Sequence, residues 1–562
     1  MSQAIVMRRE GNPPLPAAET IRPDAEPSAT PPAAAPAPPP FVPLPPLKAA
    51  AYAAGSVLIG LTQGLGLNFV SANITGIQGS LGATQIEANW LTAAYMATNM
   101  TATLFLYKVR TQFGLRRFAE IGIVVYVLIT AAHLFTNDLR SALAVRLVAG
   151  VVAPPLSTLA FFYMLEWLPP SKKLTVGICF GLIGTQIAPS LARVVSPELL
   201  QLGDWHGLYL FEAGLALICL ATIFLLPITP TPRMKVFDRG DLVSFPLIAL
   251  SFGSLSLVLT MGRLYWWMDT PWIGVMLAVS IASLILLLLI EFHRTNPSID
   301  LRWLGTYDML AISGSLLLFR FLLSEQTVGA VGLLTALGMQ NDQMIPLFWV
   351  IVAASLAGYA FTAMVMTPAN VEALHLLALL LIAVAALMDA QSTSLARPEQ
   401  FFVSQAMMGF AGALFLPTAL LSGFSRALKR GAMSILSFLV VFLGSQSLGA
   451  ILSSAILSTF QVVREKYHSS VITEQLTLLN PLVAQRVQAY SGAYAKALPD
   501  TALRSAEGVA LLGKAATQEA NVLAYNDMFL LIFAAALAGI AGLGIHSLYA
   551  TIRNHHAAAV SA

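Results

Sequence analysis

Apolar stretches of about 20 residues recur along this chain from Lys48 onward, separated by short polar connections. A helix needs about 20 such residues to cross the ~30 Å hydrocarbon core of a bilayer. The pattern predicts fourteen spans, near residues 49–70, 88–107, 118–136, 141–164, 174–195, 207–227, 242–260, 272–291, 308–336, 344–366, 371–389, 401–424, 432–459 and 527–550. The chain is therefore expected to be an all-α polytopic membrane protein, since helices satisfy their own backbone hydrogen bonds in lipid.

The scarcity of charge supports this reading and excludes other classes. Hydrophobic residues make up 57% of the chain and charged residues 10%, against roughly 45–50% and 25% in soluble domains. The net charge of +3 is spread over short connections, so nucleic acid is not an expected partner. Cys179 and Cys219 both lie in apolar runs, and neither a metal-ligand spacing nor a nucleotide-binding glycine loop is found. We expect no enzyme, no metal and no resident cofactor.

The charges of the short connections predict which side of the membrane each one faces, because cytoplasmic loops collect Lys and Arg. With the N-terminus inside, the inner connections contain Lys108, Arg110, Arg116, Arg117, Lys172, Lys173, Arg233, Lys235, Arg239, Arg294, Arg302, Arg426, Lys429 and Arg430. The outer ones contain only Arg140, Arg193, Arg263 and Arg397. The asymmetry predicts an even number of spans with both termini in the cytoplasm.

Three segments lie outside the predicted spans. Residues 1–47 are rich in proline and read as a disordered cytoplasmic tail, and residues 553–562 as a second one. The outer connection 461–526 is long and reads as amphipathic helices: Asn480 and Pro481 start a helix whose apolar stripe is formed by Val483, Val487, Tyr490, Tyr494 and Ala497. The stripe fits a cap over the chain's own outer mouth or a docking surface for another protein.

Several short motifs resemble one transporter family. They are Ala88-Asn-Trp-Leu-Thr-Ala-Ala-Tyr95, Phe113-Gly-Leu-Arg-Arg117, Arg146-Leu-Val-Ala-Gly150 and Ala188-Pro-Ser-Leu191. Together with the order of the elements, they resemble the fourteen-span drug:proton antiporters of the major facilitator superfamily. The resemblance implies two six-helix bundles, residues 48–228 and 308–552, with a two-span linker hairpin between them, residues 229–307. Substrate would bind between the bundles, which rock to alternate access.

The resemblance also implies which residues serve the conformational switch: Arg146, Gly114, Arg116, Arg117 and Pro189. Members of the family usually carry an aspartate in the first span, and Gly64–Phe69 has none. The coupling acid must then lie elsewhere. Several Gram-negative members look like inner-membrane parts of tripartite exporters, which makes a periplasmic adaptor an expected partner of 461–526.

Ionisable residues inside spans normally face the bundle interior and mark a functional path. Arg146, Glu212, Arg320 and Glu325 are of this kind. Glu325, in the first helix of the second bundle, is the preferred proton-coupling acid, and Glu212 is the second candidate. Arg320 is expected to bind an anionic group of the substrate or to hold a partner carboxylate. The alternative is a purely structural salt bridge to another helix. Arg146 is a switch residue or an anchor that bonds backbone carbonyls.

Polar amides in the spans are candidates for the substrate path, although helix–helix hydrogen bonding explains such residues equally well. They are Gln63, Asn68, Asn99, Gln186, Gln326, Gln405 and Gln446. His133, His375 and His546 are expected to be packing residues. The favoured function is proton-coupled export of toxic amphipathic or aromatic small molecules from the inner membrane. The alternatives are an importer of a small organic acid and a membrane sensor without transport activity.

Overall fold

The structure is a computed structural model that describes residues 43–230, 233, 235–294 and 300–561. Most of the predicted tail 1–47 lies outside the described residues, and the first helix begins near its end, at Pro46. The described part of the chain is helical throughout and contains no strand, as the sequence predicts. A lipid-facing backbone requires such internal hydrogen bonding.

The first bundle contains six spans. They are α1 (Pro46–Ala72), α3 (Gln85–Phe113), α4 (Leu115–Ala132), α5 with α6 (Leu139–Val152 and Pro154–Glu166), and two spans within α8 (Ile178–Leu225), with the short α2 (Ile74–Ser80) and α7 (Pro170–Lys172) between them. Helix α8 turns back on itself at Asp204, whose φ of 50° is left-handed. The backbones of Gly207 and Leu199 then come into contact, as only a chain reversal allows. Thr84 starts α3 with a capping box that Glu87 completes.

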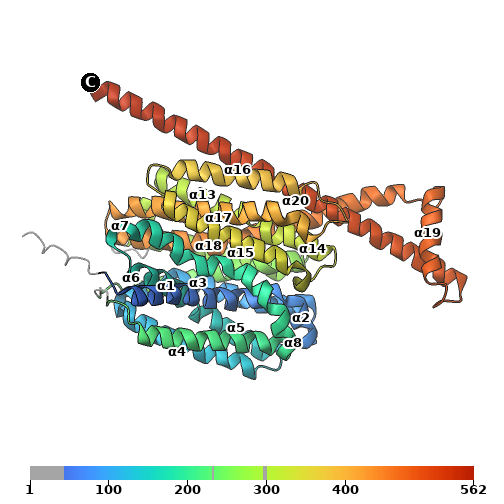
Figure 1. Ribbon diagram of the computed structural model, residues 1–562, viewed down its shortest axis with the longest axis horizontal. Helices are drawn as coiled ribbons and strands as arrows, with labels where there is room; N and C mark the ends of the chain where they lie inside the picture. The colour runs from blue at the N-terminus through green and yellow to red at the C-terminus, as the bar shows by residue number, and fades with distance from the viewer. Residues whose placement is uncertain (1–42, 231–232, 234, 295–299, 562) are drawn as a thin grey trace, which may run out of the picture. The chain divides into compact units, whose positions relative to one another are not determined.

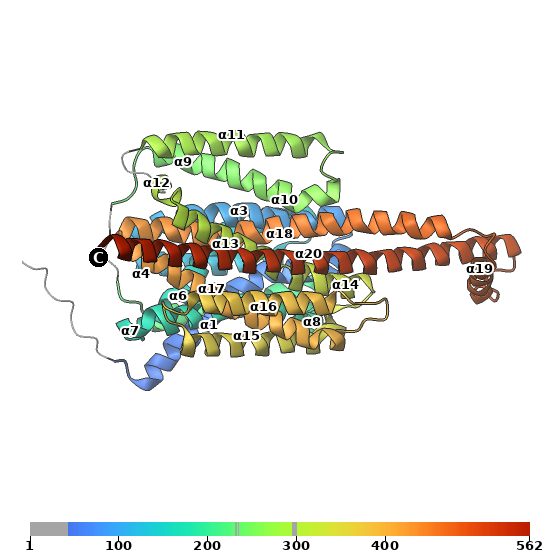
Figure 2. The same ribbon diagram turned by 90° about the horizontal axis from the view of Figure 1, so that it is seen from above.

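The linker hairpin consists of two spans. The first runs through α9 (Asp241–Ile248), a π-helical turn η3 (Ala249–Gly253) and α10 (Ser254–Tyr265), and the second is α11 (Pro271–His293). Figure 2 shows the hairpin along the side of α3 and α18.

The second bundle contains the remaining six spans. After α12 (Leu301–Leu304), they are α13 with η4 and α14 (Tyr307–Leu323, Glu325–Ala330 and Val331–Ala336), α15 (Ile345–Val365), α16 (Val371–Asp389), α17 (Phe402–Leu428), α18 (Ala432–Gln475) and α20 (Thr501–Ser561). A short α19 (Pro481–Ala493) connects the last two. Helix α20 continues through the predicted second tail, 553–562, as far as Ser561.

Thirteen helices among the described residues are long and apolar enough to cross a membrane. The predicted second span, α3, is not among them because polar residues such as Asn89, Asn99 and Lys108 lower its hydropathy. It nevertheless has 29 residues, about 43 Å of helix, and packs along α5 and α10. Together with α3, these helices make fourteen spans among the described residues, the number that the sequence predicts. The start of α1 and the end of α20 lie at the same end of the bundle (Figure 2), here called the tail end.

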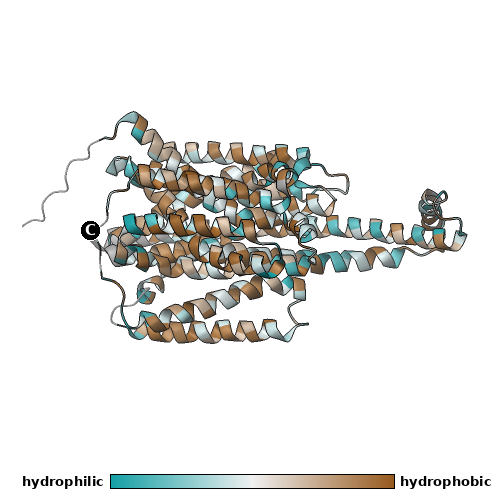
Figure 3. Cartoon of the chain, turned by 90° about the horizontal axis from the view of Figure 1, so that it is seen from below, coloured by the Kyte–Doolittle hydropathy of each residue, from teal (hydrophilic) through white to brown (hydrophobic). Residues whose placement is uncertain are grey.

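A helical arm projects from the opposite end, here called the arm end (Figure 1). It consists of the last part of α18, α19 and the first part of α20. The helices α18 and α20 are therefore longer than the predicted spans 432–459 and 527–550. Helix α18 continues beyond its apolar segment because no glycine or proline interrupts Phe460–Gln475. Figure 3 shows the change from a largely hydrophobic bundle to a more hydrophilic arm.

The arm contradicts one interpretation of the segment 461–526. It points away from the bundle (Figure 1), so the segment is not a cap over the outer mouth. The helix predicted after Asn480 is confirmed as α19, and the Asn480 side chain accepts a hydrogen bond from the Leu482 amide. Part of the apolar stripe packs inside the arm, since Val483 and Val487 are buried and α19 packs on α20. Leu478, Leu479 and Leu482 remain exposed at its tip.

A buried ionic network fastens the linker hairpin to α3 at the tail end. Lys108 Nζ lies 2.6 Å from Asp241 Oδ1, and both side chains are almost fully buried. Arg294, just after α11, reaches the same oxygen at 3.0 Å and Glu291 Oε1 at 2.7 Å. The network therefore joins α3, α9 and α11, three helices that are far apart in sequence.

One asparagine hydrogen-bonds the two bundles to each other at the arm end. Asn341, before α15, donates from Nδ2 to the Ala72 carbonyl at 2.9 Å and to Asn73 Oδ1 at 3.2 Å. Its Oδ1 accepts a hydrogen bond from Arg193 of α8 at 2.9 Å. Ala72, Asn73 and Arg193 belong to the first bundle and Asn341 to the second, so these bonds hold the bundles together on this side.

Candidate functional site

Two buried carboxyl groups meet inside the second bundle, at a glutamine. Nε2 of Gln405, on α17, donates to Asp389 Oδ2 at 2.9 Å and lies 3.2 Å from each Glu325 oxygen. Glu325 and Gln405 are fully buried, and Asp389 is 4% exposed. Because one amide nitrogen serves both acids, the two carboxyls are neighbours. We refer to Glu325, Asp389 and Gln405 as the carboxyl cluster.

The local backbone places Glu325 in this cluster. Glu325 opens the π-helical turn η4, a feature that is frequent at functional sites. Gly329, in the same turn, leaves space for the neighbouring helix: a Cβ there would lie 2.8 Å from Phe529 of α20 and 3.4 Å from the Glu325 side chain. Oε1 of Gln405 is buried without a hydrogen-bond donor. The cluster thus holds two acids, one shared donor and one vacant acceptor, away from water.

A second buried acid lies in the first bundle. Oη of Tyr126 donates to Glu212 Oε1 at 2.6 Å, and the other carboxylate oxygen has no hydrogen-bond partner. Arg146, which is 1% exposed, donates to the Gly66 carbonyl at 3.0 Å and lies 4.2 Å from the Tyr95 ring centre. Glu212 and Arg146 therefore share one interior environment. The bond to Gly66 matches the anchor interpretation of Arg146.

Arg320 lies midway along the ninth span. Its Nε is buried without an acceptor, and no ion pair of the described residues includes it. Arg320 and Glu325 do not pair with each other, as their spacing around the helix predicts. Among the described residues, Arg320 thus lacks the ion-pair partner that a structural salt bridge to another helix requires.

The predicted amides fall into two groups. Asn68 bonds the Gly64 carbonyl of its own helix, and Asn99 bonds Gly150 of α5. Gln63 lies beside Tyr95 of α3, and Gln326 donates to the Gln405 carbonyl at 3.4 Å. Asn99 and Gln326 therefore link different helices, whereas Asn68 bonds within its own helix. Gln186 and Gln446 are partly buried in α8 and α18.

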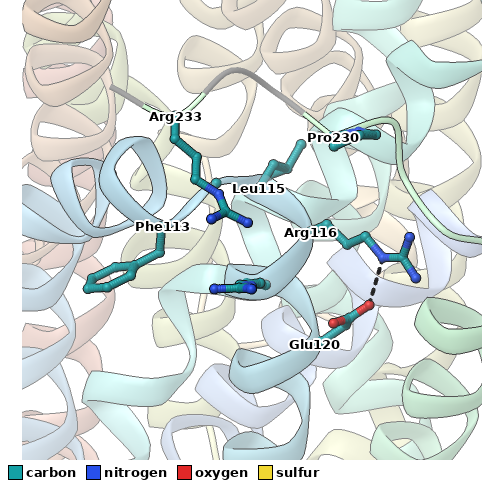
Figure 4. A pocket seen from close by; sticks show the side chains of 8 residues that line it. Phe113, Leu115, Arg116, Glu120, Pro230 and Arg233 are labelled. Carbon is teal, nitrogen blue, oxygen red and sulfur yellow. Dashed lines mark hydrogen bonds and ion pairs between the residues drawn. The ribbon is translucent and has the colours of Figure 1, made fainter. Parts of the chain in front are cut away.

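The switch residues after α3 line a small surface pocket of about 290 Å³ at the tail end (Figure 4). Gly114 ends α3 with a φ of 85°, a conformation that favours glycine. Arg116 pairs with Glu120 at 2.8 Å, and the pair is largely exposed. Arg117 lines the same pocket. Pro189 lies far from it, inside α8.

Sequence reasoning missed Asp389 and the role of Gln405. Asp389 is the last residue of the predicted span 371–389, where an acid marks a helix end at the membrane surface. Its burial comes from packing against α17, which the sequence does not show. The seven residues after Asp389, Ala390–Ala396, carry no charge. Their composition could have indicated that Asp389 lies within the membrane region. His133 is buried and stacked on Tyr209 at 4.2 Å, as expected for a packing residue.

A profile of the Major Facilitator Superfamily matches residues 56–388. The chain belongs to the Major Facilitator Superfamily. Family and fold are those of membrane transporters, and the sequence-based expectation of a multi-pass membrane protein with this fold is confirmed.

Sequence relatives in this superfamily include multidrug transporters. The chain is 25% identical over 229 residues to the probable multidrug resistance protein EmrY of Escherichia coli K12, a match of 41% of this chain and 44% of EmrY. It is 21% identical over 458 residues to the multidrug export protein EmrB of the same organism, covering 78% of this chain and 85% of EmrB. The match to EmrY thus spans less than half of that protein's length.

A solved structure supports the fold. The proton:xylose symporter XylE, bound to 6-bromo-6-deoxy-D-glucose, has a TM-score of 0.52 with 14% sequence identity, covering 87% of this chain and 95% of XylE. At this identity the likeness concerns the fold alone.

Proposed function

We propose that this superfamily member is a proton-coupled secondary transporter that exports toxic amphipathic or aromatic small molecules by alternating access. The carboxyl cluster carries the proton-coupling part of the proposal. The relatives EmrB and EmrY, named for multidrug export and resistance, support the class of cargo.

The chemistry of the carboxyl cluster suits proton exchange. Two adjacent carboxylates in a water-free interior repel each other and lose their hydration, so ionising both is strongly unfavourable. One of them therefore holds a proton while the cluster is buried, and the neighbouring carboxylate is an acceptor for it. The pair titrates as a unit, with no proton assigned to one member. Access of water during rocking would let this proton leave.

The bonds at Asn341 fit one state of such a cycle. They close the arm end between the bundles, and opening that side requires all three to break. Substrate would bind between the bundles, near the middle of the membrane. Glu212, held by Tyr126, is the second candidate for proton coupling, and Arg146, Gly114, Arg116, Arg117 and Pro189 remain the proposed switch residues.

We further propose that the chain lies in the inner membrane with both termini in the cytoplasm, and that the arm binds a periplasmic adaptor. The basic connections at the tail end support the orientation. Leu478, Leu479 and Leu482, exposed by 63%, 93% and 74% at the tip of the arm, support a protein partner. An impermeant thiol reagent should label a cysteine at Ser470 in intact spheroplasts but not one at Lys429; the opposite labelling would reverse the orientation.

Coupling is tested by Glu325→Gln and Asp389→Asn in proteoliposomes that contain the full chain. Each variant should bind and exchange ethidium, a cationic aromatic probe, as the wild type does, but lose transport driven by a pH gradient. The reason is that each removes an ionisable group from the pair and leaves a hydrogen-bonding amide. Glu372→Gln, at an exposed acid in the first turn of α16, is the matched control. Gradient-driven transport in both variants would exclude the cluster and leave Glu212.

The adaptor proposal is tested by deleting residues 482–498, which include most of α19. Cells should then lose resistance, whereas transport in proteoliposomes should persist. A loss of both would show that the tip stabilises the transporter itself.

A further inference from the structure

Arg320 differs from the other interior arginines. Arg146 lies on the Tyr95 ring and donates to the Gly66 carbonyl, and Arg193 donates to the Asn341 side chain. Arg320 Nε has no acceptor at all, and no carboxylate of the described residues lies within 4.0 Å of its guanidinium. Arg320 lies 13 residues after Tyr307, about 20 Å along the helix, and so near the middle of the membrane.

An unpaired guanidinium at this depth needs an explanation. Arginine stays charged in proteins, and a charge within the membrane is costly unless a counter-charge or hydrogen bonds compensate it. Breaking up a buried ion pair by removing one partner costs about 3–5 kcal/mol, chiefly because the other charge is left alone. Arg320 is partly buried, and its Nε is buried without an acceptor and without a carboxylate of the described residues nearby to balance the charge.

The surroundings of Arg320 place it where the two bundles face each other. Tyr359 of α15 lies near Arg320, and α15 packs against α8 of the first bundle, which contains Cys179. On the other side, α18 approaches through Gly449, where a Cβ would lie 2.9 Å from Arg320 Cγ. Tyr359, Cys179 and Phe319 belong to one apolar cluster. The cation therefore lies beside an aromatic and aliphatic wall between the bundles.

We propose that Arg320 binds the carboxylate of an amphipathic organic anion whose apolar body rests on this wall, so that the exporter's cargo includes aromatic carboxylates. This inference rests on the proposed function and names a substrate class for it. A planar guanidinium matches a carboxylate through two parallel hydrogen bonds. Gly449 is the positioning residue, since its missing side chain leaves room for the Arg320 stem.

The test uses two probes with the same ring and opposite charge, 2-naphthoate and 2-naphthylmethylammonium. Equilibrium dialysis with the purified full chain should show naphthoate binding at least 10-fold weaker in Arg320→Gln than in the wild type. Arg320→Lys should lie between them, because it keeps the charge and loses the forked geometry. The ammonium probe should bind Arg320→Gln no more weakly than the wild type. Arg302→Gln, at an exposed arginine, should leave both affinities unchanged.

A second variant guards against loss of folding. Gly449→Ala keeps the guanidinium but displaces its stem, and it should weaken naphthoate binding; Gly314→Ala, at an open position of the same span, should not. Wild type that does not bind naphthoate, or variants at 320 and 449 that bind it as tightly as wild type, would overturn the anion site. Wild type that moves neither probe along a pH gradient would instead overturn the proposed export function, whatever the binding result.

Discussion

Gly66 is a tightly packed position of the first bundle, beside the buried acid Glu212. A Cβ at this position would contact the Glu212 carboxylate and lie 2.8 Å from Tyr126 Oη, and the Gly66 carbonyl accepts the Arg146 bond. We predict that Gly66→Ala lowers stability by about 1–3 kcal/mol, the usual cost of overpacking, and reduces transport. Thermal unfolding followed by tryptophan fluorescence, together with proteoliposome transport, measures both effects.

Gly214 is the matched control for that prediction. It lies in α8 near Glu212, and a Cβ there has no neighbour within 4 Å. Gly214→Ala should keep full transport and gain up to about 1 kcal/mol from helix propensity. Equal unfolding temperatures for the two variants would contradict the packing described around Glu212.

At the scale of elements, the linker hairpin depends on charges buried beside α3. Replacing Lys108 by methionine leaves Asp241 with Arg294 as its remaining cation. We predict a destabilisation of up to about 3–5 kcal/mol, the range for breaking a buried pair. The double variant Lys108→Met/Asp241→Asn should recover part of this loss, because Arg294 then pairs with Glu291 without the additional negative charge of Asp241.

The exposed pair of Arg116 and Glu120 provides the comparison for the hairpin. Glu120→Gln should cost less than about 0.5 kcal/mol, as is typical of i,i+4 pairs on a surface. A thermal unfolding series on the wild type, Lys108→Met, Asp241→Asn and the double variant measures the coupling energy of Lys108 and Asp241. Additive effects of the two substitutions would show that the pair does not fasten the hairpin.

At the scale of the whole molecule, the bonds of Asn341 predict a lock. Asn73 Oδ1 lies 3.2 Å from Asn341 Nδ2, so cysteines at 73 and 341 should be joined by a short bis-methanethiosulfonate cross-linker, whose disulfide bonds to the two cysteines a reductant cleaves. Alternating access requires the arm end to open, and the linked protein should therefore lose transport until it is reduced. Single-cysteine variants are the controls, since Cys179 and Cys219 are buried. Full transport by linked protein would exclude opening at this side.

The sequence by itself determined the membrane architecture. Runs of about 20 apolar residues predict spans because a bilayer imposes a fixed thickness and internal backbone hydrogen bonding. Even α3, which is more polar than the other spans, was predicted from its apolar stretch at residues 88–107. The helix ends beyond the membrane were less well predicted, since hydropathy shows where a helix leaves lipid but not where it stops.

Only the tertiary structure decided the chemistry of the interior. Sequence spacing identifies Glu325 and Arg320 as ionisable residues in one span, yet it does not show that Glu325 meets Asp389 from α16 and Gln405 from α17, or that Arg320 meets no acid. A charge in a span depends on which helices pack beside it, and fourteen helices allow many arrangements with the same hydropathy. Contacts between helices distinguish the paired carboxyls Glu325 and Asp389 from Arg320, and hydrophobic periodicity does not encode these contacts.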